Sequence, residues 1–70
     1  MTGIYKNWTT GVVVSVHGIE TQTSKRKNEA GVVVEERLKH VIYYREDHPR
    51  WRCAKPLYVF SRTYLKISDL

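Results

Sequence analysis

The chain is 70 residues long, so residues 1–70 form a single domain with only a small core, because a chain this short buries about 60% of its unfolded surface. Its 41% hydrophobic and 27% charged residues exclude the compositions typical of disordered chains. Twelve Lys and Arg against seven Asp and Glu give a net charge of +5, which favours approach to polyanions.

The sequence carries one cysteine and no long apolar segment. Cys53 alone forms neither an internal disulfide nor a zinc site of the usual Cys-pair type. Residues 1–8 lack the apolar centre of a signal peptide, and no stretch approaches the roughly 20 apolar residues needed to cross a bilayer. We therefore expect a cytoplasmic protein that is not inserted in a membrane.

The clearest strand signal runs from Gly11 to Ile19. Val12, Val14 and Val16 alternate with Val13, Ser15 and His17, which is the period of two expected for a half-buried strand.

Residues 20–31 are rich in Thr, Ser, Asn and Gly, a composition that predicts a turn or mobile loop. This stretch lies between two Gly-Val-Val-Val runs, residues 11–14 and 31–34, and contains Lys25, Arg26 and Lys27. We therefore expect a long basic β-hairpin with these three residues at its exposed tip.

Two readings of residues 32–45 stay open. Val34, Leu38, Val41 and Ile42 lie at helical spacing, which favours a helix near residues 34–45 and an α+β fold. The β-branched and aromatic residues at 32–34 and 41–44 instead favour one long bent strand or two short ones. We expect the strand.

Residues 46–49 predict a break, because Pro49 disfavours a helical conformation before it. A strand is expected from Arg50 until Pro56 ends it, then a turn or 3₁₀ segment at 57–60 and a last alternating strand at 63–67. About five short strands with brief connections predict a mainly β protein, a small closed barrel that hides its sheet edges.

Several short motifs resemble an uncharacterised family of small bacterial and phage domains that are regarded as SH3-like barrels. That family runs roughly Gly-x-Tyr, a Val strand, Glu-Thr, Val-Tyr, and Trp-x-Arg-Pro-Leu-x-x-Phe. The matching residues here are Gly3-Ile4-Tyr5-Lys6, Gly11, Val14-Ser15-Val16-His17, Glu20-Thr21, Val41-Ile42-Tyr43-Tyr44, Trp51 and Lys55-Pro56-Leu57-Tyr58-Val59-Phe60. The resemblance implies a five-stranded SH3-like barrel and no catalytic residues; the basic stretch is an insert, and Lys55 replaces an Arg.

No residue set predicts catalysis. A nucleophile needs a base and an orienting group, and a metal site needs three or four convergent ligands, yet His17, His40 and His48 are scattered among strand-like and turn segments. Cys53 has two interpretations: a thiol activated by neighbouring Arg52 and Lys55, or, as we favour, a small buried apolar residue. We expect no enzyme activity, no cofactor and no metal.

Binding is the class that the sequence supports better. Aromatic residues are interleaved with cations, a mixture that lets a barrel face stack bases while cations follow a phosphate backbone. The candidate contacts for nucleic acid or another partner are Lys25, Arg26, Lys27, Tyr43, Tyr44, Arg45, Arg50, Arg52 and Lys55. Trp51 and Phe60 are assigned to the core.

The alternative is a protein-interaction module, such as a phage or mobile-element factor that docks on a host protein. Tyr, Trp and Arg are also enriched at protein interfaces. Glu35, Glu36, Glu46 and Asp47 interrupt the basic surface and favour that reading. Homodimerisation is a further expectation, because a second copy would cover an open sheet edge.

Overall fold

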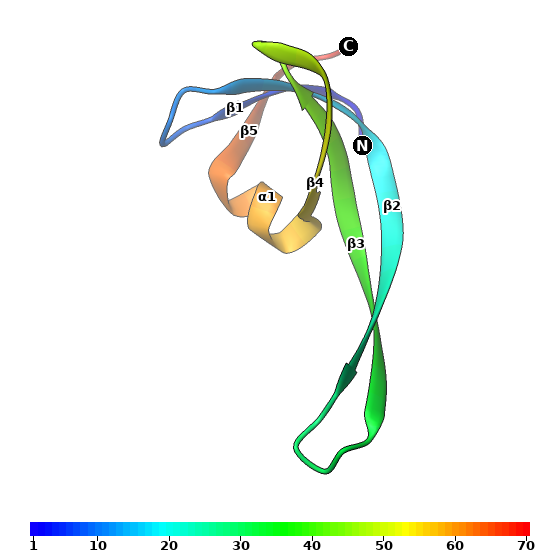
Figure 1. The fold of residues 1–70 in the computed structure, drawn as a ribbon. Coiled ribbons are helices and arrows are strands. Elements are labelled where there is room, and N and C mark those ends of the chain that lie inside the picture. Colours follow the sequence, from blue (N-terminus) through cyan, green and yellow to red (C-terminus); the bar gives the residue numbers. More distant parts are fainter.

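A computed structural model describes all of residues 1–70 as a five-stranded antiparallel sheet with one short helix (Figure 1). The elements are β1 (Gly3–Asn7), β2 (Val13–Lys27), β3 (Val33–Arg45), β4 (His48–Pro56), α1 (Leu57–Thr63) and β5 (Tyr64–Ser68). The prediction of a mainly β protein is confirmed. Because β3 is one continuous strand of 13 residues, the alternative of a helix near residues 34–45 is wrong.

The strands follow the order β4-β3-β2-β1-β5, so consecutive strands pair from β1 to β4 and β5 returns to pair with β1. β4 and β5 are therefore the two edges, and they do not pair with each other. The predicted closure into a barrel is wrong. The connection between the two edge strands forms α1, which packs between them inside the curled sheet (Figure 1).

The core lies between α1 and the inner face of the sheet. Its fully buried side chains are those of Val14 and Val16 on β2, Val41 on β3 and Phe60 on α1. The predicted alternation along the first Val-rich stretch is thus confirmed for Val14 and Val16. Tyr43 and Tyr64 complete the cluster.

Phe60 is the centre of this core. Its ring stacks on the Tyr64 ring at a centroid distance of 4.3 Å and an interplanar angle of 3°. The Tyr5 ring meets it edge-on at 5.4 Å, and the Tyr43 ring lies at 5.6 Å. One residue of α1 therefore ties together β1, β3 and β5.

Two expected turns differ from the structure. The break at 46–49 takes only Glu46 and Asp47, and the strand resumes at His48. Residues 49–51 lie in an irregularity of β4 between the Arg45–His48 and Tyr44–Arg52 pairs, which accommodates Pro49 on an edge strand. Residues 57–63 form an α-helix where a 3₁₀ turn was expected.

Trp51 lies in the same irregular stretch, and its assignment to the core is wrong. The side chain is 65% exposed, whereas Phe60, also assigned to the core, is fully buried. Cys53 pairs with Tyr43 and points to the core, as regular alternation requires. Trp51 has no partner on β3, so this alternation does not direct its side chain inward.

The molecule is elongated. Its extents are 45 × 22 × 19 Å and its radius of gyration is 14.6 Å, whereas a compact 70-residue domain has about 11 Å. The far halves of β2 and β3 account for the difference, because they project away from α1 and the other strands (Figure 1).

Truncation of Phe60 to Ala should remove a large part of the stability of the protein. Large aromatic truncations in a core cost about 3–5 kcal/mol, and a 70-residue domain has roughly 4–10 kcal/mol in all. Phe60→Leu keeps much of the buried volume. Apart from the effect of the lost ring contacts, it should lower the free energy of unfolding by less than about 1.5 kcal/mol. Urea unfolding followed by circular dichroism measures both variants; equal midpoints would contradict the central role of this ring.

The stability of the protein should fall at alkaline pH because of Tyr43. Burial, followed by the neighbouring Tyr64 hydroxyl, raises the pKa of Tyr43 to about 12 from 10.0. The native state holds this proton more tightly than the unfolded chain, so the resulting stability is fully present below pH 10 and is lost between pH 10 and 12. In urea titrations across this range, Tyr43→Phe should lose less stability than the parent; an identical decline in both would contradict the assignment.

Candidate functional site

The projecting part of the β2–β3 hairpin is the main surface feature of the protein, and we call it the ribbon: residues 21–27 of β2, residues 33–39 of β3 and the connecting tip. Its two strands form seven consecutive residue pairs, from Thr21–Lys39 to Lys27–Val33. Neither β1 nor β4 extends along it, since β1 pairs only with Val13–Val16 and β4 reaches no further than His40. At about 3.3 Å per residue the paired part is about 23 Å long.

The loop predicted for residues 20–31 is therefore much shorter in the structure. β2 continues to Lys27, and the turn is confined to 28–32, because the hydrogen-bond ladder with β3 orders the polar residues before it. The Asn28 Oδ1 atom accepts hydrogen bonds of 3.0 Å from the backbone N–H groups of Ala30 and Val32. Gly31 takes a φ of 75°, which glycine adopts without strain. Lys25, Arg26 and Lys27 accordingly lie on a strand rather than at the tip.

A β-bulge at His17 sets which residues of β2 continue the core face into the ribbon. Val16 pairs with Tyr43 and Gly18 with Ile42, so His17 has no partner on β3. The extra residue shifts the alternation of β2 by one position. After the bulge, the odd-numbered residues of β2 therefore continue the face that carries Val14 and Val16 before it.

The face that continues from the core is rich in cations, and we call it the cationic face. Its members are Thr21, Thr23, Lys25, Lys27, Val33, Glu35, Arg37 and Lys39. This face carries four cations and a single carboxylate, that of Glu35. The Glu35 carboxylate lies 3.8 Å from the Arg37 guanidinium. All of these side chains are exposed.

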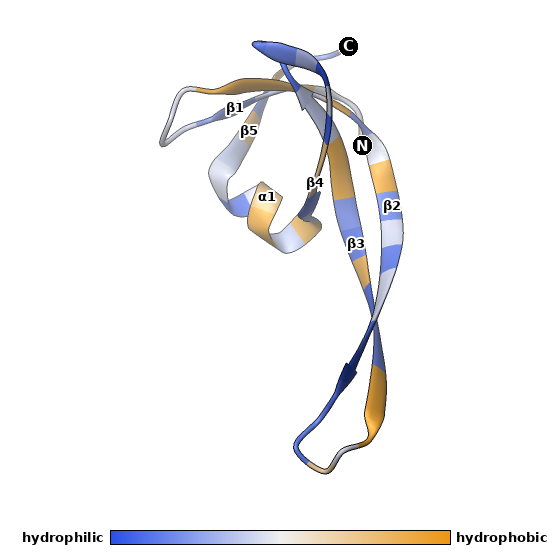
Figure 2. Cartoon of the chain, viewed as in Figure 1, coloured by the Kyte–Doolittle hydropathy of each residue, from blue (hydrophilic) through white to orange (hydrophobic).

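The opposite face of the ribbon carries no excess charge. It presents Gln22, Ser24, Arg26, Val34, Glu36 and Leu38. Its only two charged groups form an ion pair, in which the Arg26 guanidinium lies 2.6 Å from the Glu36 carboxylate. The two faces of one hairpin therefore differ sharply in charge. The hydropathy colouring shows the ribbon as largely hydrophilic, apart from the β3 residues next to the tip and one further band on β3 (Figure 2).

The predicted basic cluster is split by this arrangement. Lys25 and Lys27 lie together on the cationic face, whereas Arg26 points to the opposite face and is paired. The three cations expected together at the tip thus lie on two faces, because neighbouring residues of a strand point to opposite sides.

The predicted aromatic residues do not form an exposed stacking surface with the cations. Tyr43 is buried in the core. Tyr44 is half-buried on the outer face of the sheet, where its ring meets the His17 ring edge-on at 5.0 Å.

The remaining predicted cations are dispersed over the body. The Arg45 guanidinium binds the Asp47 carboxylate at 2.6 and 2.9 Å, and this contact lowers the pKa of Asp47. The Arg52 guanidinium lies 2.6 Å from Glu20, and the Lys55 ammonium lies 5.7 Å from the centroid of the Tyr64 ring. Arg50 alone is exposed without an ion-pair partner.

Arg37 and Lys39 are the site residues that the sequence interpretation missed. Both follow the expected loop, in the segment where helix and strand were weighed, and neither stands out from the surrounding charges. The register that places them opposite Thr23 and Thr21 is set by the turn at 28–32, which the composition predicted only as part of a longer loop.

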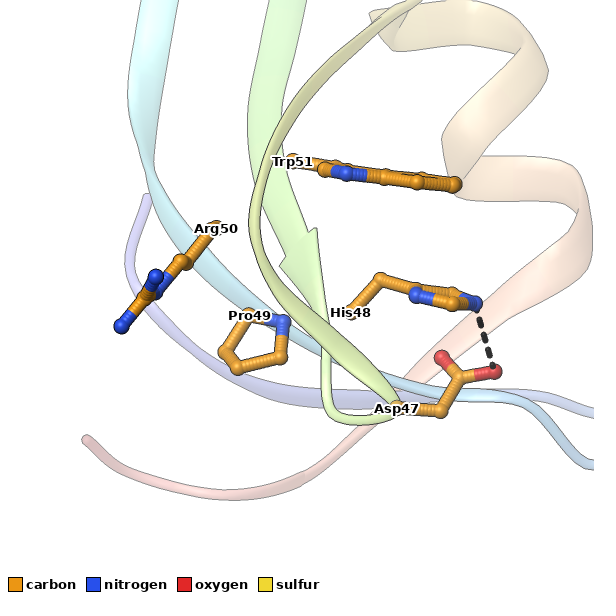
Figure 3. A pocket seen from close by; sticks show the side chains of 5 residues that line it. All are labelled: Asp47, His48, Pro49, Arg50 and Trp51. Atoms are coloured by element: carbon orange, nitrogen blue, oxygen red, sulfur yellow. Dashed lines mark ion pairs between the residues drawn. The ribbon is translucent and has the colours of Figure 1, made fainter.

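Trp51 and His48 form an exposed aromatic pair at the β3–β4 turn. Their rings are stacked at 4.3 Å with an interplanar angle of 7°, and the His48 imidazole lies 3.9 Å from the Asp47 carboxylate. Figure 3 shows these three side chains on one side of β4, with Pro49 and Arg50 on the other. The open cavity of about 230 Å³ at this turn is lined by these five residues, and the His48 ring lies between the Trp51 indole and the Asp47 carboxylate (Figure 3).

A second shallow cavity of about 250 Å³ lies on the outer face of the sheet at the bulge, lined by His17, Gly18, Ile19, Glu20, Ile42 and Arg52. The Arg52–Glu20 ion pair occupies its polar side. No three His, Cys, Asp or Glu side chains converge in the structure. Cys53 is half-buried against the core, and its thiol lies 3.6 Å from the Trp51 carbonyl oxygen.

Comparison with models of known protein families, with curated proteins and with solved structures finds no match. The single helix of the structure is too short to span a bilayer.

Proposed function

We propose that this protein is a non-enzymatic module that binds nucleic acid through the cationic face of its β2–β3 ribbon. The observation that carries the proposal is the segregation of charge: Lys25, Lys27, Arg37 and Lys39 share one exposed face with one carboxylate. Cations gathered in this way attract phosphates and release the counterions condensed on them. The interface differs from the one expected from the sequence, because Arg26 and the tyrosines are not part of it.

The position of the ribbon supports this function. A surface that projects beyond the body reaches a large polymer without interference from α1 or the edge strands (Figure 1). The cations of the body support it less, since Arg45, Arg52 and Lys66 are each held by a carboxylate at 2.6–2.7 Å. The three lysines of the cationic face have no ion-pair partner, and Arg37 has only a longer contact of 3.8 Å with Glu35, so the ribbon offers the better ligands for phosphate.

We also propose that the sheet belongs to the SH3-like class, with its barrel left open. The return of β5 to β1 and the short helical connection after β4 support this assignment. The sequence resemblance to small bacterial and phage domains points in the same direction.

Replacement of Lys25 and Lys27 together by Ala should weaken nucleic-acid binding without unfolding the protein. Each phosphate contact in B-form DNA contributes about 0.9 to the slope of log affinity against log salt, so the slope should fall by about 2. Fluorescence-anisotropy titrations at several salt concentrations measure it. Exposed strand residues carry little stability, so the circular dichroism melting curve should change little.

Two control variants sharpen this test. Lys6→Ala with Arg62→Ala removes the same charge from exposed positions of the body and should leave the slope nearly unchanged. Arg26→Ala removes one cation from the opposite face of the ribbon and should have less effect than Lys27→Ala. Equal losses in all variants would show that net charge, rather than this face, governs binding, and no binding at low salt would refute the proposed function.

A protein partner or a second copy of the chain is the alternative function, and one observation favours it. Leu65 and Ile67 are 61% and 55% exposed on β5, whose outer edge is unpaired. Edge strands with exposed apolar side chains readily pair with another strand. If this edge is an interface between copies, light scattering should give twice the 8.3 kDa chain mass, and Leu65→Lys should restore the monomer; a monomeric parent would rule out self-association.

A further inference from the structure

We infer that the ligand of the ribbon is double-stranded DNA in the B form, and that the ribbon lies in its major groove. This inference rests on the proposed function and identifies the kind of nucleic acid. It depends on the dimensions and composition of the ribbon, whereas the proposed function depends on its charge.

The ribbon has the width that a major groove accepts. The groove is about 12 Å wide and 8.5 Å deep and admits a two-stranded β-ribbon, whereas the minor groove is only about 6 Å wide. Residues 21–27 and 33–39 are paired with each other alone, so no third strand widens the ribbon. The paired length of about 23 Å corresponds to about seven base pairs of B-form DNA.

The composition of the ribbon argues against a single-stranded ligand. Proteins that hold single strands stack the bases on aromatic side chains next to the cations. Residues 21–39 contain no Phe, Trp, Tyr or His. The exposed Trp51 ring lies on the body, stacked on the His48 ring, so it adds no stacking surface to the cationic face.

Duplex RNA fits the ribbon less well than duplex DNA does. The major groove of A-form RNA is deep and narrow, and side chains do not reach its base edges. A ribbon whose cations all lie on one broad face would contact only the rim of that groove. Duplex DNA is therefore the ligand that uses the whole face.

The middle of the cationic face has the side chains that major-groove contacts require. Arg37 pairs across the ribbon with Thr23, and Lys25 pairs with Glu35 beside them. Arg forms paired hydrogen bonds with the O6 and N7 atoms of guanine, and Thr contacts the methyl group of thymine. Two residues along a β-strand span about 6.6 Å, which is close to the axial rise of two nucleotides in DNA. Lys25 and Lys27 are therefore spaced to contact phosphates of one DNA strand.

The test uses the full chain and three probes of identical sequence: a 20-base-pair DNA duplex, the RNA duplex and the single DNA strand. Anisotropy titrations at one salt concentration should give at least about tenfold tighter binding to the DNA duplex than to the other two. Dimethyl sulfate footprinting of the bound duplex should show protection of guanine N7 atoms, which lie in the major groove. A ligand that fills the minor groove should not displace the protein.

A matched pair of variants tests which face of the ribbon contacts the groove. Arg37→Ala should reduce N7 protection, and Arg26→Ala, which removes the same charge from the opposite face, should leave it unchanged. Equal affinity for the DNA and RNA duplexes, tighter binding to the single strand, or displacement by the minor-groove ligand would overturn the groove assignment and leave the proposed function standing. Failure to bind any probe would overturn both.

Discussion

The contact between Phe60 and Tyr64 is the constraint on which the rest of the structure depends. Few side chains are buried in this chain, and their cluster is assembled around one ring that stacks on a neighbour at 4.3 Å. Because Phe60 lies on α1 and Tyr64 begins β5, the stack fixes the helix against the sheet and directs β5 back to β1. An open sheet would otherwise expose its inner face to water, since no strand closes it.

The ribbon is the opposite kind of structure, with many backbone hydrogen bonds and almost no buried side chains. A two-stranded hairpin is marginally stable by itself in water, so the ribbon depends on its attachment at Val41, which is fully buried in the body. The two parts of the protein therefore have different structural roles. The core holds one end of β2 and β3 in place, and the other end is left free to present charge at a distance from it.

Sequence patterns predicted the parts of this fold that depend on local alternation. The Val14 and Val16 face, the strand ending at Pro56 and the burial of Phe60 could all be predicted, because alternation, a proline and a large apolar side chain are visible in the local sequence. Three features could not: the open sheet, the extension of β2 to Lys27 and the exposure of Trp51. Each is decided by the pairing between strands, for which polar residues such as Gln22 and Ser24 give no signal in the local sequence. Half of the candidate site could be predicted from the sequence, because Lys25 and Lys27 belong to a run of basic residues. Arg37 and Lys39 could be placed beside them only from the register of the hairpin.

The bulge at His17 gives β2 one more residue than the part of β3 with which it pairs. Loss of that single residue would leave every cross-strand pair from Gly18–Ile42 to Lys27–Val33 in place, so Lys25 and Lys27 would stay on the side of Arg37 and Lys39. The composition of this face depends instead on the register of the hairpin, and a shift of one residue would place Lys25 and Lys27 with Glu36 and Val34. A change in the length of the turn at 28–32 therefore offers a route by which related chains could exchange a charged surface for a neutral one while every core residue is kept.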